Sequence, residues 1–147
     1  MILLDAYAVL ALLKDEPAAA DVATMLEREE CTLTSVGVAE ILDHLVRVVG
    51  ADAETAVLDL AQLGLANALP IDDMIGTRAG LLQARHYHRA ERAVSLADCV
   101  LAAAADHHNA PLATADPHLL ALCNDEGISY FALPDSNGHS WGATRKT

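Results

Sequence analysis

The sequence predicts an α/β domain in which a central, mainly parallel β-sheet carries helices on both faces. Short apolar segments alternate with longer amphipathic ones along the 147 residues, and this alternation is typical of βαβ units. Hydrophobic residues make up 53% of the chain but aromatic residues only 3%, so the core must consist mainly of Ala, Leu, Val and Ile. A chain of this length is long enough to close one hydrophobic core without disulfides or a structural metal.

In the first half of the chain, capping residues and glycines delimit the expected helices. We expect strands at residues 2–4 and 31–33, and helices at residues 8–13, 17–28, 34 or 35 to 49, and 53–63. The first strand is wholly apolar, which indicates a buried strand. Pro17 suits the first turn of a helix, and either Thr34 or Ser35 suits the capping position that precedes one. Gly50 and Gly64 follow the last helical residues, where glycine commonly ends a helix.

The second half of the chain continues the same alternation. We expect an extended piece at residues 65–71, helices at 73–88, 95–107 and 117–125, and strands at 111–114 and 128–133. Ser95 can cap an Ala-rich helix, and Gly127 ends the last one. We place a single domain at residues 1–133. The polar tail at residues 134–147 is expected to be loosely ordered.

The charge balance limits how this chain could contact nucleic acid. The formal net charge of −12 argues against binding spread over the whole surface, because phosphates are held by Lys and Arg. Any such site must therefore be local. Arg85, Arg89 and Arg92 have the i, i+4, i+7 spacing of one helical face, provided that the helix continues that far. This arginine face is either an RNA contact or an ordinary solvated surface.

Composition also predicts the cellular compartment. No apolar run approaches the roughly 20 residues of a transmembrane helix. The apolar opening segment has no basic residues before it and no cleavage site after it, so it does not resemble a secretory signal. Cys31, Cys99 and Cys123 lie in apolar stretches without a CxxC motif, as buried thiols of a reducing compartment do. We expect a cytoplasmic protein with no membrane contact and no disulfides.

Four acidic residues are expected at the edge of the sheet where parallel α/β folds form their sites. Asp5 ends the first strand, and Asp116 follows the strand at residues 111–114. Glu40 and Asp98 fall in the first turns of two helices, from which a side chain can reach the same carboxyl edge. Four carboxylates brought together repel one another unless a cation lies among them. Mg²⁺ or Mn²⁺ prefers such oxygen ligands, so the sequence suggests a divalent metal site.

Three of these acids also have purely structural explanations. Asp116 precedes a proline and could simply cap a helix. Asp98 follows Ser95 at the spacing of a capping box. Glu40 falls on a polar stripe typical of a solvated helix face. Only Asp5 has no evident cap or ion pair in its local sequence, and a buried carboxylate needs a partner.

In combination, the segments that carry these acids resemble a known family. They are ILLDAYAVLALL, TSVGVAEIL, SLADCVLAAAAD and PLATADPHL, and their order and separations are similar to those of PIN-domain ribonucleases, particularly the VapC toxins of VapBC toxin–antitoxin systems. The resemblance covers nearly all of the chain up to about Leu133. The chain departs from the family at Tyr7, where members commonly carry Ser or Thr.

The resemblance implies a metal-dependent endoribonuclease. Asp5, Asp98 and Asp116 would hold Mg²⁺ or Mn²⁺, and Glu40 would complete the catalytic set by binding or deprotonating a metal-activated water that attacks the phosphodiester. Thr114 could contact either a carboxylate or an RNA phosphate. A cognate VapB-type antitoxin and a homodimer are implied as partners.

The main alternative is a catalytically silent PIN-like module that binds RNA or a protein. The presence of all four acids favours the enzyme, because a binding module could lose any of them without harm. No GxxxxGK phosphate loop occurs, and the histidines do not have the spacing of a zinc site.

Overall fold

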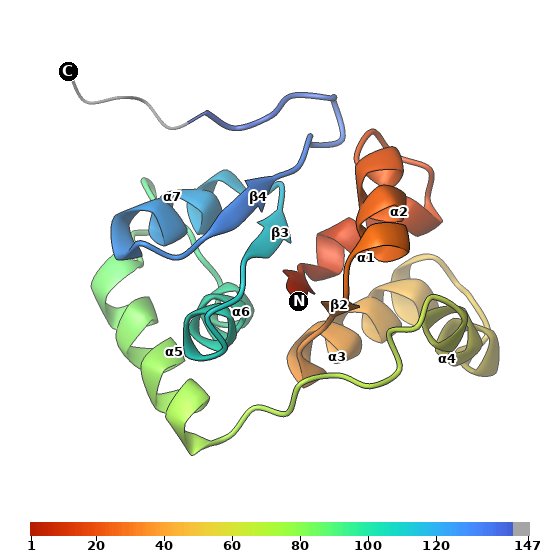
Figure 1. Ribbon diagram of the computed structural model, residues 1–147, viewed down its shortest axis with the longest axis horizontal. Coiled ribbons are helices and arrows are strands. Elements are labelled where there is room, and N and C mark those ends of the chain that lie inside the picture. Colours follow the sequence, from red (N-terminus) through yellow and green to blue (C-terminus); the bar gives the residue numbers. More distant parts are fainter. Residues whose placement is uncertain (143–147) are drawn as a thin grey trace.

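The computed structural model describes residues 1–142 and has a four-stranded parallel sheet at its centre (Figure 1). Its strands are β1 (Ile2–Leu4), β2 (Cys31–Thr32), β3 (Leu112–Thr114) and β4 (Tyr130–Ala132), in the spatial order β2–β1–β3–β4. In β1, one of the two inner strands, Leu3 pairs with Thr32 of β2 on one side and with Leu112 of β3 on the other. The predicted α/β class with a parallel sheet is confirmed.

Helices separate successive strands along the chain. They are α1 (Ala6–Leu13), α2 (Ala19–Arg28), α3 (Ser35–Asp43), α4 (Ala53–Gln62), α5 (Asp73–His86), α6 (Leu96–His107) and α7 (Pro117–Glu126). The predicted cap at Thr34 is confirmed, since its side chain accepts a hydrogen bond from the amide of Gly37 at 3.0 Å. The single helix expected up to residue 49 instead changes into a π-helical segment, η1 (His44–Val48).

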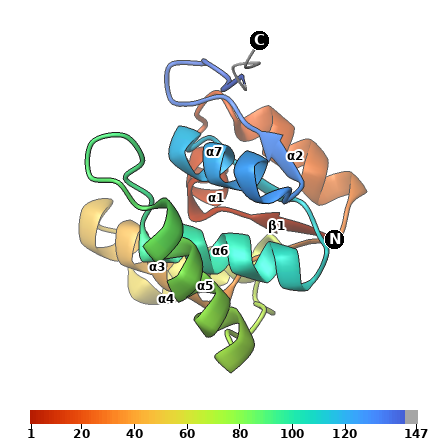
Figure 2. The same ribbon diagram turned by 90° about the vertical axis from the view of Figure 1, so that its left-hand side faces the viewer.

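Two hydrophobic clusters enclose the sheet, one on each face. Helices α5, α6 and α7 cover one face, and α1 to α4 cover the other (Figure 1). Figure 2 views the molecule from the side of α5, α6 and α7, with β1 behind them. The strand residues alternate accordingly, because Leu3 belongs to the first cluster whereas Ile2 and Leu4 belong to the second. Four successive buried alanines, Ala102–Ala105, let α6 pack closely on its neighbours without aromatic side chains.

Two predicted segments differ from the structure in ways that affect the site. Helix α5 ends at His86, two residues earlier than predicted, and the chain then forms a short loop closed by a bridge between His88 and Arg92. The extended piece at residues 65–71 does not join the sheet as a strand. It makes only an isolated parallel bridge between Leu69 and Thr34.

The start of the predicted tail has defined local structure. Pro134 and Ser140 form an isolated bridge, and the Asp135 carboxylate accepts hydrogen bonds from the amides of Asn137 and His139, both at 2.9 Å. The prediction of a loosely ordered tail also covers residues 143–147, which lie outside the described residues. Cys99 and Cys123 are buried thiols as expected, while Cys31 is partly exposed. Among residues 1–142, no helix is both long and apolar enough to cross a membrane.

Candidate functional site

Asp5 lies where β1 passes into α1, at the carboxyl edge of the sheet. It occupies the N-cap position of α1 but makes no capping bond with its side chain. Its Oδ2 instead accepts a hydrogen bond from the Thr114 hydroxyl at the end of β3, with an O···O distance of 2.6 Å. Burial raises the pKa of Asp5 to about 7, and the negative charges of Asp98, Glu40 and Asp116 add to the rise, against the opposing effect of the Thr114 bond. All four predicted acids are therefore close enough for their charges to interact.

Asp98 combines the structural role considered above with a place among the acids. Its Oδ2 accepts from the Ser95 amide at 2.8 Å, and its own amide donates to the Ser95 hydroxyl at 3.0 Å, which forms a complete capping box. Burial raises the pKa of the Asp98 carboxyl, and the charge of Asp116 acts in the same direction. Ser95 and the nearby His118 lower this pKa in part.

Asp116 likewise caps its helix. Its Oδ1 accepts from the amides of His118 at 2.7 Å and Leu119 at 3.3 Å, so the capping role at the start of α7 is confirmed. The Asp116 amide donates to the Thr114 hydroxyl at 3.0 Å. Thr114 thus joins Asp5 and Asp116 through one buried hydroxyl.

Glu40 is the most exposed of the four acids. It lies on α3, and burial together with the charge of Asp98 raises its pKa. Glu40 and Asp5 line one side of a pocket of about 500 Å³ between α1 and α3. Water can therefore reach Asp5 and Glu40 through this pocket.

Each of the three aspartates uses only one carboxylate oxygen for the fold. Among residues 1–142, Oδ1 of Asp5, Oδ1 of Asp98 and Oδ2 of Asp116 accept no hydrogen bond from the protein. These hard oxygen donors suit Mg²⁺ or Mn²⁺ chemically. Within the same residues, no three His, Cys, Asp or Glu side chains lie close enough together to hold a metal ion directly. The set still fits a magnesium-like ion, because Mg²⁺ usually takes one or two carboxylates directly and keeps several waters.

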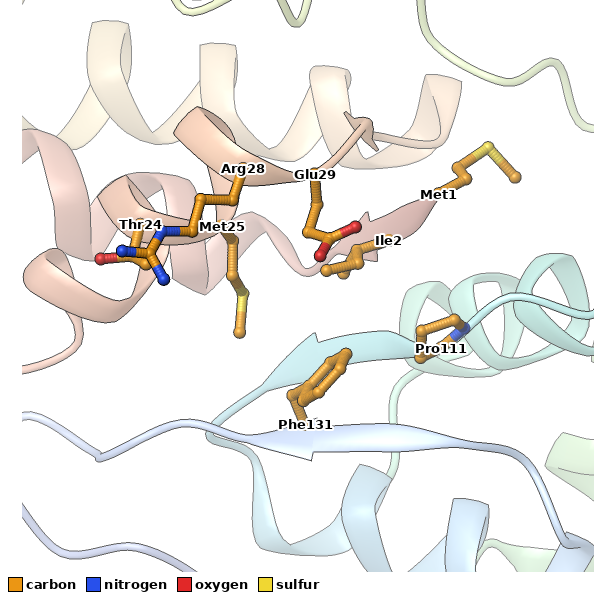
Figure 3. Close-up of a pocket in the computed structure, with 8 residues that line it drawn as sticks. All are labelled: Met1, Ile2, Thr24, Met25, Arg28, Glu29, Pro111 and Phe131. Carbon is orange, nitrogen blue, oxygen red and sulfur yellow. The ribbon is translucent and has the colours of Figure 1, made fainter.

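A second cavity lies at the other end of the strands and lacks this chemistry (Figure 3). It measures about 370 Å³ and is lined by apolar side chains such as Met25 and Phe131, with Ile2 and Pro111 at the amino ends of β1 and β3. Glu29 is the single carboxylate in its lining. The carboxyl edge is therefore the candidate active site.

The structure changes the interpretation of the predicted RNA contacts. Since α5 ends at His86, Arg89 and Arg92 do not continue its surface, and the predicted arginine face is wrong as a helical face. Arg85 contacts Glu126 at 2.9 Å, and Arg92 contacts Asp125 at 2.8 Å. These ion pairs join neighbouring elements of the fold.

Thr114 also has a different role from RNA contact. Its side chain is fully buried, with both hydrogen bonds directed to the acids, so RNA cannot reach it. Tyr7, whose role the sequence left open, donates its hydroxyl hydrogen to the carbonyl of Pro134 at 3.2 Å. It therefore fixes the start of the tail beside the pocket.

Sequence reasoning missed three residues near the acids. His118 follows Asp116 in the first turn of α7 and lowers the pKa of the Asp98 carboxyl. Lys14 and His44 line the pocket that contains Asp5 and Glu40. Lys14 offered one signal in the sequence, because it is one of only two lysines in the chain.

Three solved structures illustrate the likeness in fold. FitAcB from Neisseria gonorrhoeae is 20% identical, with a TM-score of 0.66 over 89% of this chain and 96% of that chain. VapBC2 from Rickettsia felis, bound to a promoter DNA fragment, is 16% identical, with a TM-score of 0.66 over 89% and 98%. VapC20 from Mycobacterium tuberculosis, described as a sarcin–ricin loop cleaving toxin, is 16% identical, with a TM-score of 0.64 over 82% and 94%. At these identities the likeness establishes the fold.

A comparison with family models gives the more direct assignment. No curated protein matches the chain significantly. The model of the PIN domain family matches residues 2–124, a span that includes Asp5, Glu40, Asp98 and Asp116. The chain therefore belongs to the PIN domain family.

Proposed function

We propose that this protein is a metal-dependent endoribonuclease of the VapC type. The observation that carries the proposal is the set of three aspartates at the carboxyl edge, each with one carboxylate oxygen left without a protein partner, beside the exposed Glu40. The described sarcin–ricin loop cleavage by M. tuberculosis VapC20, which shares the fold, supports RNA as the substrate class.

Each residue of the site has a distinct role in the proposed reaction. Asp5, Asp98 and Asp116 would hold Mg²⁺ or Mn²⁺, directly or through its waters, and Thr114 fixes the relative position of Asp5 and Asp116. The bound ion supplies a positive charge that stabilises the phosphorane-like transition state and makes water more acidic. Glu40 lines the open pocket, where it orients the attacking water and accepts its proton. Its raised pKa makes Glu40 a better proton acceptor than an ordinary surface carboxylate.

The test is cleavage of a structured RNA by the purified protein, with two variants that separate catalysis from helix capping. Asp98→Asn keeps an oxygen for the Ser95 amide but loses the charge, so we expect cleavage to fall by at least about 10²-fold. Ser95→Ala removes the other half of the capping box and should cost about 1 kcal/mol of stability while cleavage persists.

Metal removal provides the complementary measurement. Cleavage should require Mg²⁺ or Mn²⁺ and stop in excess EDTA, because the four mutually repelling acids need a bound cation to accept a phosphate and to stabilise the charge of the transition state. Undiminished cleavage in EDTA, or a fully active Asp98→Asn variant, would contradict the proposal. RNA binding without cleavage in any metal would favour the silent binding module instead.

The proposal includes two protein partners. A solved structure with the same fold, 18% identical with a TM-score of 0.63, is described as a toxin–antitoxin complex from Klebsiella pneumoniae, which supports a small VapB-type antitoxin as the partner of this chain. The homodimer implied by the resemblance stays a prediction, and sedimentation of the purified protein at several concentrations tests it.

A further inference from the structure

The pocket that contains Asp5 and Glu40 extends along α1 to a lysine and a histidine. Lys14 directly follows α1, at the opposite end of the helix from Asp5, and the rise of a helix places the two residues roughly 13 Å apart along its axis. His44 lies one turn beyond Glu40, where α3 passes into η1. The Nζ of Lys14 lies 2.7 Å from Nε2 of His44, so the two side chains form one wall of the pocket.

Lys14 is the cation of this pocket that no carboxylate neutralises. Among residues 1–142 it forms no ion pair, although Glu16 and Asp43 line the same pocket. The Asp43 carboxylate is taken by Arg47 through two hydrogen bonds of 2.8 and 2.7 Å. Glu16 lies beside Tyr7, whose pKa is raised by burial and by the charge of Glu16.

The contact with His44 leaves most of the lysine's hydrogen-bonding capacity unused. An ammonium group has three N–H donors, and the lone pair of a neutral imidazole takes one of them. Two donors remain for a ligand in the pocket. His44 is half-buried and holds the exposed lysine side chain against the wall, so His44 acts as a positioning residue.

A polyanionic substrate needs such a cation here. The protein carries a net charge of −12, and the four acids at the candidate active site repel phosphates. Three arginines already form ion pairs with Glu126, Asp106 or Asp125 and so are less available to bind a phosphate, namely Arg78, Arg85 and Arg92. Lys14 is set back from the acids along a continuous pocket, which suits a phosphate that flanks the cleaved one.

We propose that Lys14, held by His44, binds a backbone phosphate of the RNA next to the phosphate that is cleaved at the acids. The proposal rests on the ribonuclease function proposed above and adds a substrate-binding position to it. Positioning a neighbouring phosphate fixes the register of the strand in the pocket between α1 and α3.

The test compares Lys14→Gln with a control that removes the same charge elsewhere. Arg28→Gln is the matched control, because Arg28 is exposed, makes no ion pair among residues 1–142, and lines the cavity at the other end of the strands (Figure 3). Lys14→Gln should raise KM for a single-stranded RNA by about tenfold, the loss typical of a charge-assisted contact, with a much smaller change in kcat. Arg28→Gln should leave KM close to that of the wild type.

Salt dependence distinguishes a phosphate contact from a general charge effect. The slope of log binding constant against log salt should become shallower by about 0.7 in Lys14→Gln, as for one lost contact to a single strand, and stay unchanged in Arg28→Gln. This binding is measured by fluorescence anisotropy in the Asp98→Asn background and without divalent metal, so that cleavage does not interfere with the measurement. Equal slopes and KM values in the two variants would overturn the proposal.

The same measurements separate this inference from the proposed function. If the wild type cleaves RNA but Lys14→Gln binds RNA with the wild-type affinity and slope, only the Lys14 contact is wrong. If Lys14→Gln weakens binding of an antitoxin and not of RNA, the position belongs to the antitoxin interface and the proposal is overturned. If RNA is bound through Lys14 but never cleaved in Mg²⁺ or Mn²⁺, the ribonuclease function fails while the phosphate contact stands.

Discussion

One buried hydroxyl organises acids that lie more than a hundred positions apart in the chain. Thr114 has no exposed surface, and its side chain donates to Asp5 while it accepts from the amide of Asp116. A hydroxyl can serve both bonds because it carries a donor and acceptor lone pairs. The bond engages Oδ2 of Asp5 and leaves Oδ1 without a hydrogen bond from residues 1–142.

The first prediction at the scale of residues concerns the charge of Asp5. Asp5→Asn keeps an oxygen that accepts from Thr114 but removes a buried charge among like charges. We expect the variant to melt a few degrees higher than the wild type at pH 8 in EDTA, for a relief of about 1 kcal/mol. Calorimetry of both proteins, with the exposed Asp21→Asn as a control, measures the difference.

The pH dependence of this difference has a definite sign. The folded-state pKa of Asp5 is raised from 3.8 to about 7, so the folded wild type binds an extra proton between these values and loses stability as the pH rises through them. The advantage of Asp5→Asn should therefore be small at pH 4 and fully present above pH 7. Excess Mn²⁺ should stabilise the wild type more than the variant. A destabilised variant with the wild-type response to Mn²⁺ would exclude Asp5 as a ligand.

Between elements, an ion network centred on Glu126 joins the end of α7 to α5. The Glu126 side chain is only 11% exposed and lies 3.1 Å from Arg78, 2.9 Å from Arg85 and 2.6 Å from His86. Hydrogen bonds from His86, Arg85 and Arg78 lower the pKa of Glu126 to about 2, although burial opposes them. Arg85, which the sequence suggested for RNA contact, thus takes part in an ion network between two helices.

The second prediction follows from this lowered pKa. Glu126 contributes stability above its unfolded-state pKa of about 4.5, and this contribution is lost as the pH falls towards 2. Glu126→Gln should lower the free energy of unfolding at pH 7 by about 1–3 kcal/mol, as for a lost set of charged hydrogen bonds. Urea unfolding at pH 7 and pH 3 measures it. If the wild type and Glu126→Gln lose equal stability between these pH values, the network does not stabilise the fold.

Local signals made most elements predictable, whereas contacts distant in sequence were not predictable. Thr34 and Ser95 cap their helices through bonds to residues three positions away, and Gly127 adopts a left-handed φ of 71° at the end of α7. The early end of α5 has no comparable local signal. After His86 the chain forms reciprocal backbone bonds between His88 and Arg92, of 2.8 and 2.9 Å, which helical periodicity does not reveal.

The same difference between local signals and contacts distant in sequence applies to the candidate site. The four acids could be proposed because each stands at a recognisable strand end or helix start, in an order that resembles a family. The bond between Thr114 and Asp5 joins residues 109 positions apart, and the contact between Lys14 and His44 joins residues 30 positions apart. Neither pairing follows from the period of a helix or a strand, so the structure was needed to find them.

For the whole molecule, the uneven distribution of charge defines the partner that the site would accept. The chain has 21 acidic and nine basic residues, and the described ion pairs occupy Arg47, Arg78, Arg85 and Arg92. The carboxyl edge keeps three aspartates with a free oxygen each. A partner that blocks this edge must therefore bring positive charge. A guanidinium is the best match, because its five N–H donors can reach the free oxygens of more than one aspartate.

The last prediction tests such a partner with the intact protein. Co-expression with a small antitoxin encoded beside this chain should yield a complex with one antitoxin per toxin chain, in which an antitoxin arginine contacts Asp5, Asp98 or Asp116. Replacing that arginine by Gln should restore RNA cleavage by the complex, since the remaining contacts of the antitoxin no longer cover the acids. Asp98→Asn in the toxin should weaken the complex, whereas Asp21→Asn, on the exposed surface of α2, should not. Growth of the host during high expression of the active chain alone, or a complex indifferent to Asp98→Asn, would contradict inhibition at this edge.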